Sequence, residues 1–332
     1  MDGDIYILGI ESSAHTFGIA IIDKYLNILS DVRDSLKPVY TLGIDPKEAA
    51  EHHAKVASKL LRKALETAGI KIGDISAIAF SKGPGLGPAL RIGATLARAL
   101  AYKYQKPLYP VHHGLGHVEL AVFKLNFKDP LVLLVSGGHT AILAFNDGRW
   151  RTYGETLDIT LGNVFDMFAR EIGISFPGGP KIEKLAEKGE NYIEMPYNVK
   201  GNNVVYSGLL SYATSLINKE RIEDIAYSLQ ETAFSMIVEA TERALIQLGK
   251  KEIAVTGGVA CNNRLINMLK SMAKGYNVKV DRIDPKYNED NGVQIAILGL
   301  LYYTSNVKGV KIESSYISQK IRIEEEPIPW RV

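Results

Sequence analysis

Apolar runs separated by small polar turns are the clearest pattern along the chain. Residues 5–10 predict a buried strand, residues 12–14 a tight polar turn, and residues 16–22 the strand that returns. The tip of such a hairpin exposes backbone N–H groups, which can face an anionic ligand. The first half of the chain is therefore expected to open with a hairpin.

The same pattern occurs again in the second half of the chain. Residues 131–135 predict a strand, residues 136–138 a turn and residues 139–143 a returning strand. The His-Thr pairs that begin at His15 and His139 lie 124 residues apart, about the length of one domain. We predict an internal duplication, although two unrelated hairpins with a His-Thr pair in common would give the same pattern.

Apolar residues at helical spacing predict helices after each hairpin. Asp45 offers an N-cap, Pro46 suits the first helical position, Glu48 completes a capping box, and Gly69 ends the run. Alternating strands and helices indicate an α/β protein with a parallel or mixed sheet in each domain. Other helices are expected at 89–104, 180–188, 225–248, 264–273 and 293–303, strands at 75–81 and 252–256, and a frayed tail at 324–327.

No low-complexity linker divides the chain, so its two lobes are expected to share an interface and a cleft. We place the N-terminal lobe at residues 1–128 and the C-terminal lobe at residues 129–332. The last helix, about 291–304, and the tail are expected to pack back toward the first lobe.

Composition narrows the class of protein. The chain has 332 residues, of which 46% are hydrophobic and 23% charged, which excludes global disorder. Cys261 is its one cysteine, so no internal disulfide forms and a reducing compartment is expected. An acidic N-terminus and the lack of a long apolar run favour a cytoplasmic protein without a membrane partner. The net charge of +2 is too balanced to argue for nucleic acid by itself.

Five glycine-rich turns at 9–13, 83–87, 136–138, 177–180 and 257–258 are predicted to follow strands. Such turns bring backbone amides close to anions, so the set indicates a nucleotide held between the lobes. Any single turn could simply end a strand. Neither the P-loop nor the dinucleotide-binding glycine motif is present.

His113 and His117 stand four residues apart, which places two imidazoles on one face of a helix, as in many metal sites. Gly114 and Gly116 each cost about 1 kcal/mol in a helix, so they are expected to admit a substrate or a neighbouring backbone. Two buried histidines bonded to backbone are the alternative. Asp290 is a candidate further ligand, although alone it would suit a helix N-cap.

Two further groups of residues have ordinary structural explanations. Asp166 and Arg170 would form an exposed ion pair on a helix, although Asp166 could also bind a ribose hydroxyl. Cys261 has no basic neighbour in sequence, so it is expected to be packed rather than nucleophilic.

As a set, these motifs resemble those of the TsaD/KEOPS catalytic-subunit family, in collinear order over roughly residues 5–303. The matching motifs are residues 9–11 with 14–18, 82–91, the His112-His113-x-x-Gly116-His117 pattern, 135–140, 176–180, 257–264 and 290–292.

The resemblance implies the duplicated actin/sugar-kinase/chaperone-ATPase (ASKHA) fold, with two lobes and an interlobe cleft. It implies transfer of a threonylcarbamoyl group from threonylcarbamoyl-adenylate to N6 of the adenosine 3′ of the tRNA anticodon. It also implies three sets of site residues: His113, His117 and Asp290 for one iron or zinc ion; Ser136, Gly137, Gly138 and His139 for the substrate pocket; and Asp166, Gly179, Glu183 and Asn262 for the adenylate, an ATP/AMP-type nucleotide in the cleft.

The run at residues 14–18 resembles the archaeal type, which implies tRNA and KEOPS-type subunits, including a small atypical protein kinase, as partners. Two positions depart from that branch. Leu134 stands where a tyrosine is common and cannot ligate a metal, so open positions there would be filled by substrate or water. His139 stands where asparagine is common.

Three other functions compete with this interpretation. An ATPase or sugar kinase of the same fold would use the glycine turns but gives the two histidines no role. A metallopeptidase lacks the glutamate of H-E-x-x-H, because Gly114 stands in its place. A non-enzymatic scaffold in a larger assembly is the third. Since the chain is nearly neutral, partner subunits are expected to supply a basic surface for tRNA.

Overall fold

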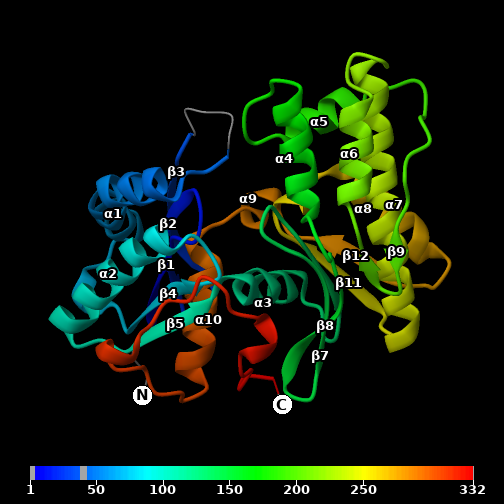
Figure 1. The fold of residues 1–332 in the computed structure, drawn as a ribbon. Helices are drawn as coiled ribbons and strands as arrows, with labels where there is room; N and C mark the ends of the chain where they lie inside the picture. The colour runs from blue at the N-terminus through cyan, green and yellow to red at the C-terminus, as the bar shows by residue number, and fades with distance from the viewer. Residues whose placement is uncertain (1–3, 38–42, 332) are drawn as a thin grey trace.

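Two five-stranded mixed sheets form the frame of the computed structural model, which describes residues 4–37 and 43–331 (Figure 1). The first has the order β3-β2-β1-β4-β5 and the second β8-β7-β6-β11-β12. Three antiparallel strands are followed by two parallel ones in both, so the predicted duplication is confirmed. The strands are β1 (Tyr6–Glu11), β2 (Thr16–Asp23), β3 (Ile28–Ser35), β4 (Ala77–Gly83), β5 (Leu108–His112), β6 (Leu131–Val135), β7 (Thr140–Asn146), β8 (Arg149–Glu155), β11 (Glu252–Thr256) and β12 (Lys279–Arg282).

Helix α1 (Pro46–Ala68) starts and stops as its sequence predicts. The Asp45 side chain accepts from the backbone of Lys47 and Glu48, and Gly69 adopts φ 68° at the other end. The other predicted helices are confirmed with ends at most three residues away. Helices α3, α4, α6 and α9 lie outside the predicted ranges, although the spacings of His113 with His117 and of Asp166 with Arg170 already suggested α3 and α4. The helices after α1 are α2 (Gly87–Tyr104), α3 (His113–Leu125), α4 (Leu161–Glu171), α5 (Gly179–Ala186), α6 (Ser207–Ser215), α7 (Ile222–Leu248), α8 (Asn263–Lys274), α9 (Pro285–Asn288) and α10 (Gly292–Thr304).

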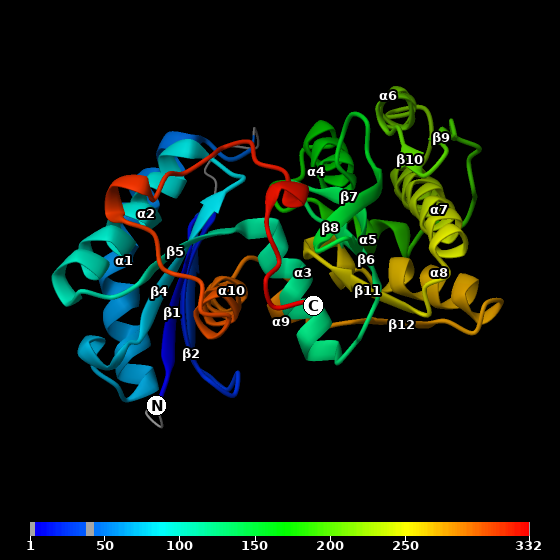
Figure 2. The ribbon, with the colours of Figure 1, turned by 90° about the horizontal axis from the view of Figure 1, so that it is seen from below.

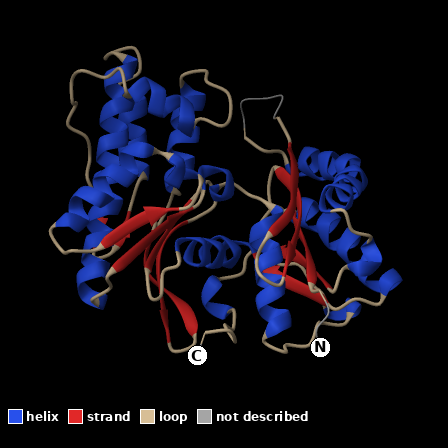
Figure 3. Cartoon of the chain, turned by 180° about the vertical axis from the view of Figure 1, so that it is seen from behind, coloured by secondary structure: helices blue, strands red, loops and turns tan. Residues whose placement is uncertain are grey.

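The elements stack in layers with two helices at the centre. Helices α1 and α2 cover the outer face of the first sheet, and α4 to α8 cover the outer face of the second (Figure 3). Helices α3 and α10 share the core between the two sheets (Figure 2). Alternate residues of β6 face opposite ways, since Leu133 joins the outer core and Leu134 the central one. No helix in the described part of the chain is long and apolar enough to cross a bilayer.

Glycines bring the backbone of α10 directly against its neighbours. A Cβ at Gly9 of β1 would lie 2.3 Å from the backbone nitrogen of Ala296. A Cβ at Gly116 of α3 would lie 2.8 Å from the carbonyl oxygen of Gln294, which confirms that Gly116 admits a neighbouring backbone. The first turns of α3 and α10 are thereby held side by side.

The acidic tail is ordered, so the expectation that it frays is wrong. Ser318 donates its N–H to the Lys82 carbonyl at 2.7 Å, and Glu324 accepts from the Thr152 N–H at 3.0 Å. Glu326 is only 3% exposed because its carboxylate pairs with the Lys82 ammonium at 2.7 Å. The tail therefore connects β4 of the first sheet to β8 of the second, along the junction visible in Figure 2.

Replacing Glu326 with glutamine should lower the free energy of unfolding by about 2 kcal/mol, because the half-buried Lys82 ammonium then lacks its counterion. Urea denaturation measures the change. In a double-mutant cycle, the added Lys82→Met change should cost less in the Glu326→Gln background than in the unmodified protein. Strictly additive costs would show that the ion pair does not anchor the tail.

Candidate metal centre between the two lobes

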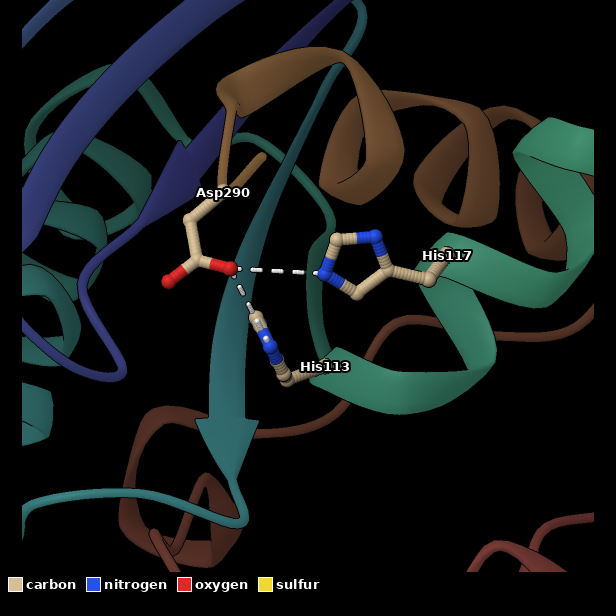
Figure 4. Close-up of side chains that lie close together, drawn as sticks. All are labelled: His113, His117 and Asp290. Carbon is tan, nitrogen blue, oxygen red and sulfur yellow. Dashed lines mark hydrogen bonds and ion pairs between the residues drawn. The ribbon is translucent and has the colours of Figure 1, made fainter. Parts of the chain in front are cut away.

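Two histidines of α3 and an aspartate before α10 converge between the sheets (Figure 4). His113 and His117 are 7% and 1% exposed, and both Nε2 atoms face the Asp290 Oδ1 atom, at 3.6 and 3.3 Å. The ligand atoms of all three residues lie within 4.8 Å of one another. Asn291, not Asp290, caps α10, since its side chain accepts from Gln294 N–H at 3.0 Å. The Asp290 carboxylate is thus left for the histidines.

Buried polar groups fix the ring of His113. Its Nδ1 lies 2.9 Å from the Glu11 carboxylate, 3.1 Å from the Gln294 amide and 3.2 Å from the Ser13 hydroxyl. Carboxylates that hold the remote nitrogen of a histidine in this way orient the other nitrogen toward a metal. The ring of His113 therefore presents Nε2 to Asp290.

The carboxylates around His113 favour its protonated form. Burial opposes protonation of the ring, but the carboxylates of Glu11 and Asp290 outweigh it and raise the pKa of His113 to about 9. Burial lowers the pKa of His117 despite its bond to Asp290. Burial would raise the pKa of Asp290, but the two histidines hold it well below its usual range. The surroundings favour one positive charge between two carboxylates, which a metal cation would also supply.

The donor set fits a transition metal. Two imidazole nitrogens and one carboxylate oxygen suit zinc or iron and leave further coordination positions open. A histidine bonded to backbone groups, the alternative for His113 and His117, is found at His112 instead. His112 accepts from Leu115 N–H at 3.1 Å and contacts the Ile321 carbonyl at 3.2 Å. Leu134 is 2% exposed in the central core and offers no ligand.

The turn from Ser136 to His139 lies next to this centre. The Ser136 hydroxyl accepts from the backbone of Gly138 and His139, at 3.2 and 3.0 Å. The rings of His139 and His113 are stacked with centroids 6.3 Å apart. A Cβ on Gly138 would meet nothing within 4 Å, and one on Gly137 only the Asn163 side chain at 3.9 Å. The structure thus brings these four predicted residues to the edge of the centre with open space beside the glycines.

The four residues predicted to contact the adenylate lie on or beside α4, α5 and the start of α8, and the side chains of Asp166, Glu183 and Asn262 are engaged within the protein. Asp166 accepts from Gly178 N–H at 2.7 Å, and Glu183 accepts from Asn263 N–H at 3.0 Å. Asn262 caps α8 through Arg264 N–H at 2.8 Å and donates to Gln230 at 2.9 Å. Gly179 is the first residue of α5, and its N–H bonds to the Asp166 carboxylate as that of Gly178 does.

Two expectations for this region are wrong. The glycine turn at 177–180 follows helix α4 and not a strand. Arg170 pairs with Glu171 at 3.7 Å, because the Asp166 carboxylate turns toward the backbone of Gly178.

Cys261 is half-buried, and burial raises its pKa, as expected for a residue that is not a nucleophile.

An aromatic contact connects the two clusters across the junction. His15, in the turn between β1 and β2, meets Phe176 edge-on with ring centroids 5.4 Å apart. Sequence reasoning assigned no role to Glu11, Gln294 or Phe176. The position of Glu11 at the end of a strand, inside a glycine-rich turn, was the available signal.

Replacing Glu11 with glutamine should weaken metal binding by about 10- to 100-fold, since the orienting charge on His113 is lost while the side-chain shape is kept. Competition with a coloured zinc chelator measures the affinity. Gln230→Glu alters a buried amide away from the three ligands. It tests whether any substitution of a buried polar residue weakens metal binding. Unchanged affinity in Glu11→Gln would exclude the orienting role.

Comparison with known proteins agrees with this geometry. The family described as "TsaD: tRNA N6-adenosine threonylcarbamoyltransferase" matches residues 27–297. Proteins named tRNA N6-adenosine threonylcarbamoyltransferase from Thermococcus kodakarensis and Caldivirga maquilingensis are 54% and 48% identical. The first alignment covers 97% of this chain and 99% of the relative, and the second covers 98% of both.

Solved structures show the fold alone. T. kodakarensis HypF superposes with a TM-score of 0.63 at 16% identity, over 91% of this chain and 48% of HypF. Component A of the Acidaminococcus fermentans (R)-2-hydroxyglutaryl-CoA dehydratase gives 0.55 at 15% identity, over 89% of this chain and 98% of that protein. The two-lobed ASKHA fold is confirmed. The chain belongs to the tRNA N6-adenosine threonylcarbamoyltransferase family.

Proposed function

We propose that this protein transfers a threonylcarbamoyl group from threonylcarbamoyl-adenylate to N6 of the adenosine 3′ of the tRNA anticodon. Its family membership supports the reaction, and the converging His113, His117 and Asp290 support a metal-assisted form of it. The observation that carries the proposal is that Asp290 meets His113 and His117, more than 170 residues away in sequence, with all three ligand atoms within 4.8 Å of one another.

The reaction forms a bond from N6 to the carbamoyl carbon and breaks the bond from that carbon to the phosphate oxygen. AMP leaves with the electron pair of the broken bond, and the proton that N6 loses passes to water. An iron or zinc ion held by His113, His117 and Asp290 supplies, when bound, a Lewis acid that stabilises negative charge developing on the carbonyl oxygen.

The chain's own residues bind and orient the donor. The turn from Ser136 to His139 lines the pocket of the transferred group, because the open space beside Gly137 and Gly138 admits it, and Gly179 at the start of α5 borders the adenylate. Asp166 and Glu183 are bonded within the protein, so we assign them mainly to holding the α5 segment, which then shapes the adenylate site. Asn262 caps α8 and bonds to Gln230, and we assign it to the α8 side of the same site. His139, stacked on His113, lies where it would contact the transferred group.

The partners follow from the same proposal. tRNA is the acceptor, and KEOPS-type subunits with a small atypical protein kinase would assemble with the chain in the cytoplasm. Partner subunits would add basic surface, because this chain carries a net charge of only +2.

The proposed reaction is tested by comparing the amount of AMP released with the amount of N6-threonylcarbamoyladenosine formed. Protein assembled with its partner subunits should yield AMP and modified nucleoside in equal amounts from threonylcarbamoyl-adenylate and tRNA. Chromatography quantifies AMP, and mass spectrometry quantifies the nucleoside. Hydrolysis of ATP to ADP without modified nucleoside would favour the ATPase or kinase alternative. Normal assembly without either product would favour a scaffold.

A further inference from the structure

Three lysines line one surface hollow on the second lobe, away from the candidate metal centre. Lys181, Lys184 and Lys188 surround a space of about 430 Å³ together with Leu185. The remaining wall is the segment between α4 and α5, residues 173–175. We call this feature the lysine hollow.

Charges on α5 are separated between two faces. Lys181, Lys184 and Lys188 follow the i, i+3, i+7 spacing that places side chains on one side of a helix. Lys188 lies beyond the last residue of α5, but its N–H still bonds to the Leu185 carbonyl at 3.0 Å and continues the turn. The Glu183 carboxylate is directed elsewhere, toward Asn263 N–H. The hollow is therefore lined by cations without a carboxylate.

Two of the three ammonium groups are uncompensated. Lys181 is held by the Ser175 carbonyl and hydroxyl, both at 2.7 Å, which fixes the wall of the hollow. Lys184 and Lys188 are exposed, and among residues 4–37 and 43–331 neither forms an ion pair. Two free lysines beside an anchored third favour an anion with several oxygens, such as a phosphodiester.

The segment that forms the wall of the hollow also contacts the first lobe. Ser175 precedes Phe176, whose ring contacts His15 of the first lobe. His15 follows Ser13 by two residues, and the Ser13 hydroxyl contacts His113. A polyanion seated on the lysines would therefore lie on the same side of the junction as the segment that contacts His15.

We propose that the lysine hollow binds backbone phosphates of the RNA substrate and so positions the acceptor adenosine at the centre. This inference rests on the proposed function, because it names the surface that receives the tRNA. Phosphate contacts of this kind fix the register of a nucleic acid without reading its sequence. The chain's near-zero net charge thus conceals a local basic site.

A binding experiment with the full chain tests the proposal. The ligand is a tRNA transcript with adenosine 3′ of the anticodon, and fluorescence anisotropy measures its affinity across a salt series. The double change Lys184→Gln with Lys188→Gln should weaken binding about tenfold at 0.1 M salt and reduce the salt slope by about 1.5, since two phosphate contacts are lost. Lys181 stays unchanged because it supports the wall.

Lys270→Gln with Lys274→Gln on α8 removes the same charge from another exposed face and should change binding less than twofold. Equal effects of the two double variants, or no binding by the unmodified chain at low salt, would overturn the proposal. Metal content and product formation distinguish failure of the hollow from failure of the proposed reaction. The variant with both lysines replaced should keep its metal and form product at saturating tRNA. Absence of product from both this variant and the unmodified protein would reject the proposed reaction and not the hollow.

Discussion

Replacing Asp290 with alanine is expected to empty the metal centre and slow threonylcarbamoyl transfer about a thousandfold, a loss of about 4 kcal/mol of transition-state stabilisation. Asp290 is the only carboxylate among the three predicted ligands, and both histidine Nε2 atoms face it. Because Asn291 caps α10, the substitution should leave the helix start intact. Metal analysis by mass spectrometry and a single-turnover rate measure the two effects.

Glu289→Ala is the matched control for that substitution. It removes the adjacent carboxylate, which is exposed and pairs with Arg33 at 3.6 Å. The control should keep its metal and its rate, because an exposed ion pair contributes little. Circular dichroism should give the same folded spectrum for both variants. A full rate from Asp290→Ala protein that has lost its metal would contradict the role of the centre.

The second large effect is expected from Gly9→Ala, which should lower the free energy of unfolding by about 3 kcal/mol, at the upper end for overpacking. The added methyl would lie 2.3 Å from Ala296 N and 2.4 Å from the Gly292 carbonyl oxygen, both of them backbone atoms of α10. Relief requires α10 to move away from β1, which would also shift Asp290 from the histidines. Denaturant unfolding and metal affinity should therefore change together.

Gly73→Ala provides the comparison for Gly9→Ala. A Cβ on Gly73 would meet nothing within 4 Å, so this change should be neutral or slightly stabilising. Similar unfolding curves for the two variants would show that the contact between β1 and α10 does not hold the lobe together.

Local sequence signals predicted helices that have recognisable start and stop residues. Helix α1 has an N-cap acid and a terminal glycine, and both act as predicted. Helix α6 was missed, and α4 was indicated only by the spacing of Asp166 and Arg170. Their ends are set by packing on α7 and by Asp158, which accepts from Tyr206 and Ser207 N–H at 2.9 and 2.8 Å. Such long-range contacts have no local signature.

In the candidate site, too, local contacts could be predicted from the sequence and long-range contacts could not. Helical spacing indicated that His113 and His117 share a face, whereas Asp290 could be linked to them only by resemblance. Glu11 and Gln294 reach His113 because β1, α3 and α10 pack together, a contact between segments more than 100 residues apart. The tail was expected to fray because Glu324 to Glu326 looked solvated, but partners at Lys82 and Thr152 lie far away in sequence.

Metal removal and return measures the central claim most directly. The assembled protein, its chelator-treated form and the same form reloaded with iron or zinc should be incubated with threonylcarbamoyl-adenylate and unmodified tRNA, and the nucleosides analysed by mass spectrometry. We predict N6-threonylcarbamoyladenosine from the first and third samples and none from the second. Undiminished product from folded, metal-free protein would contradict a reaction that depends on His113, His117 and Asp290.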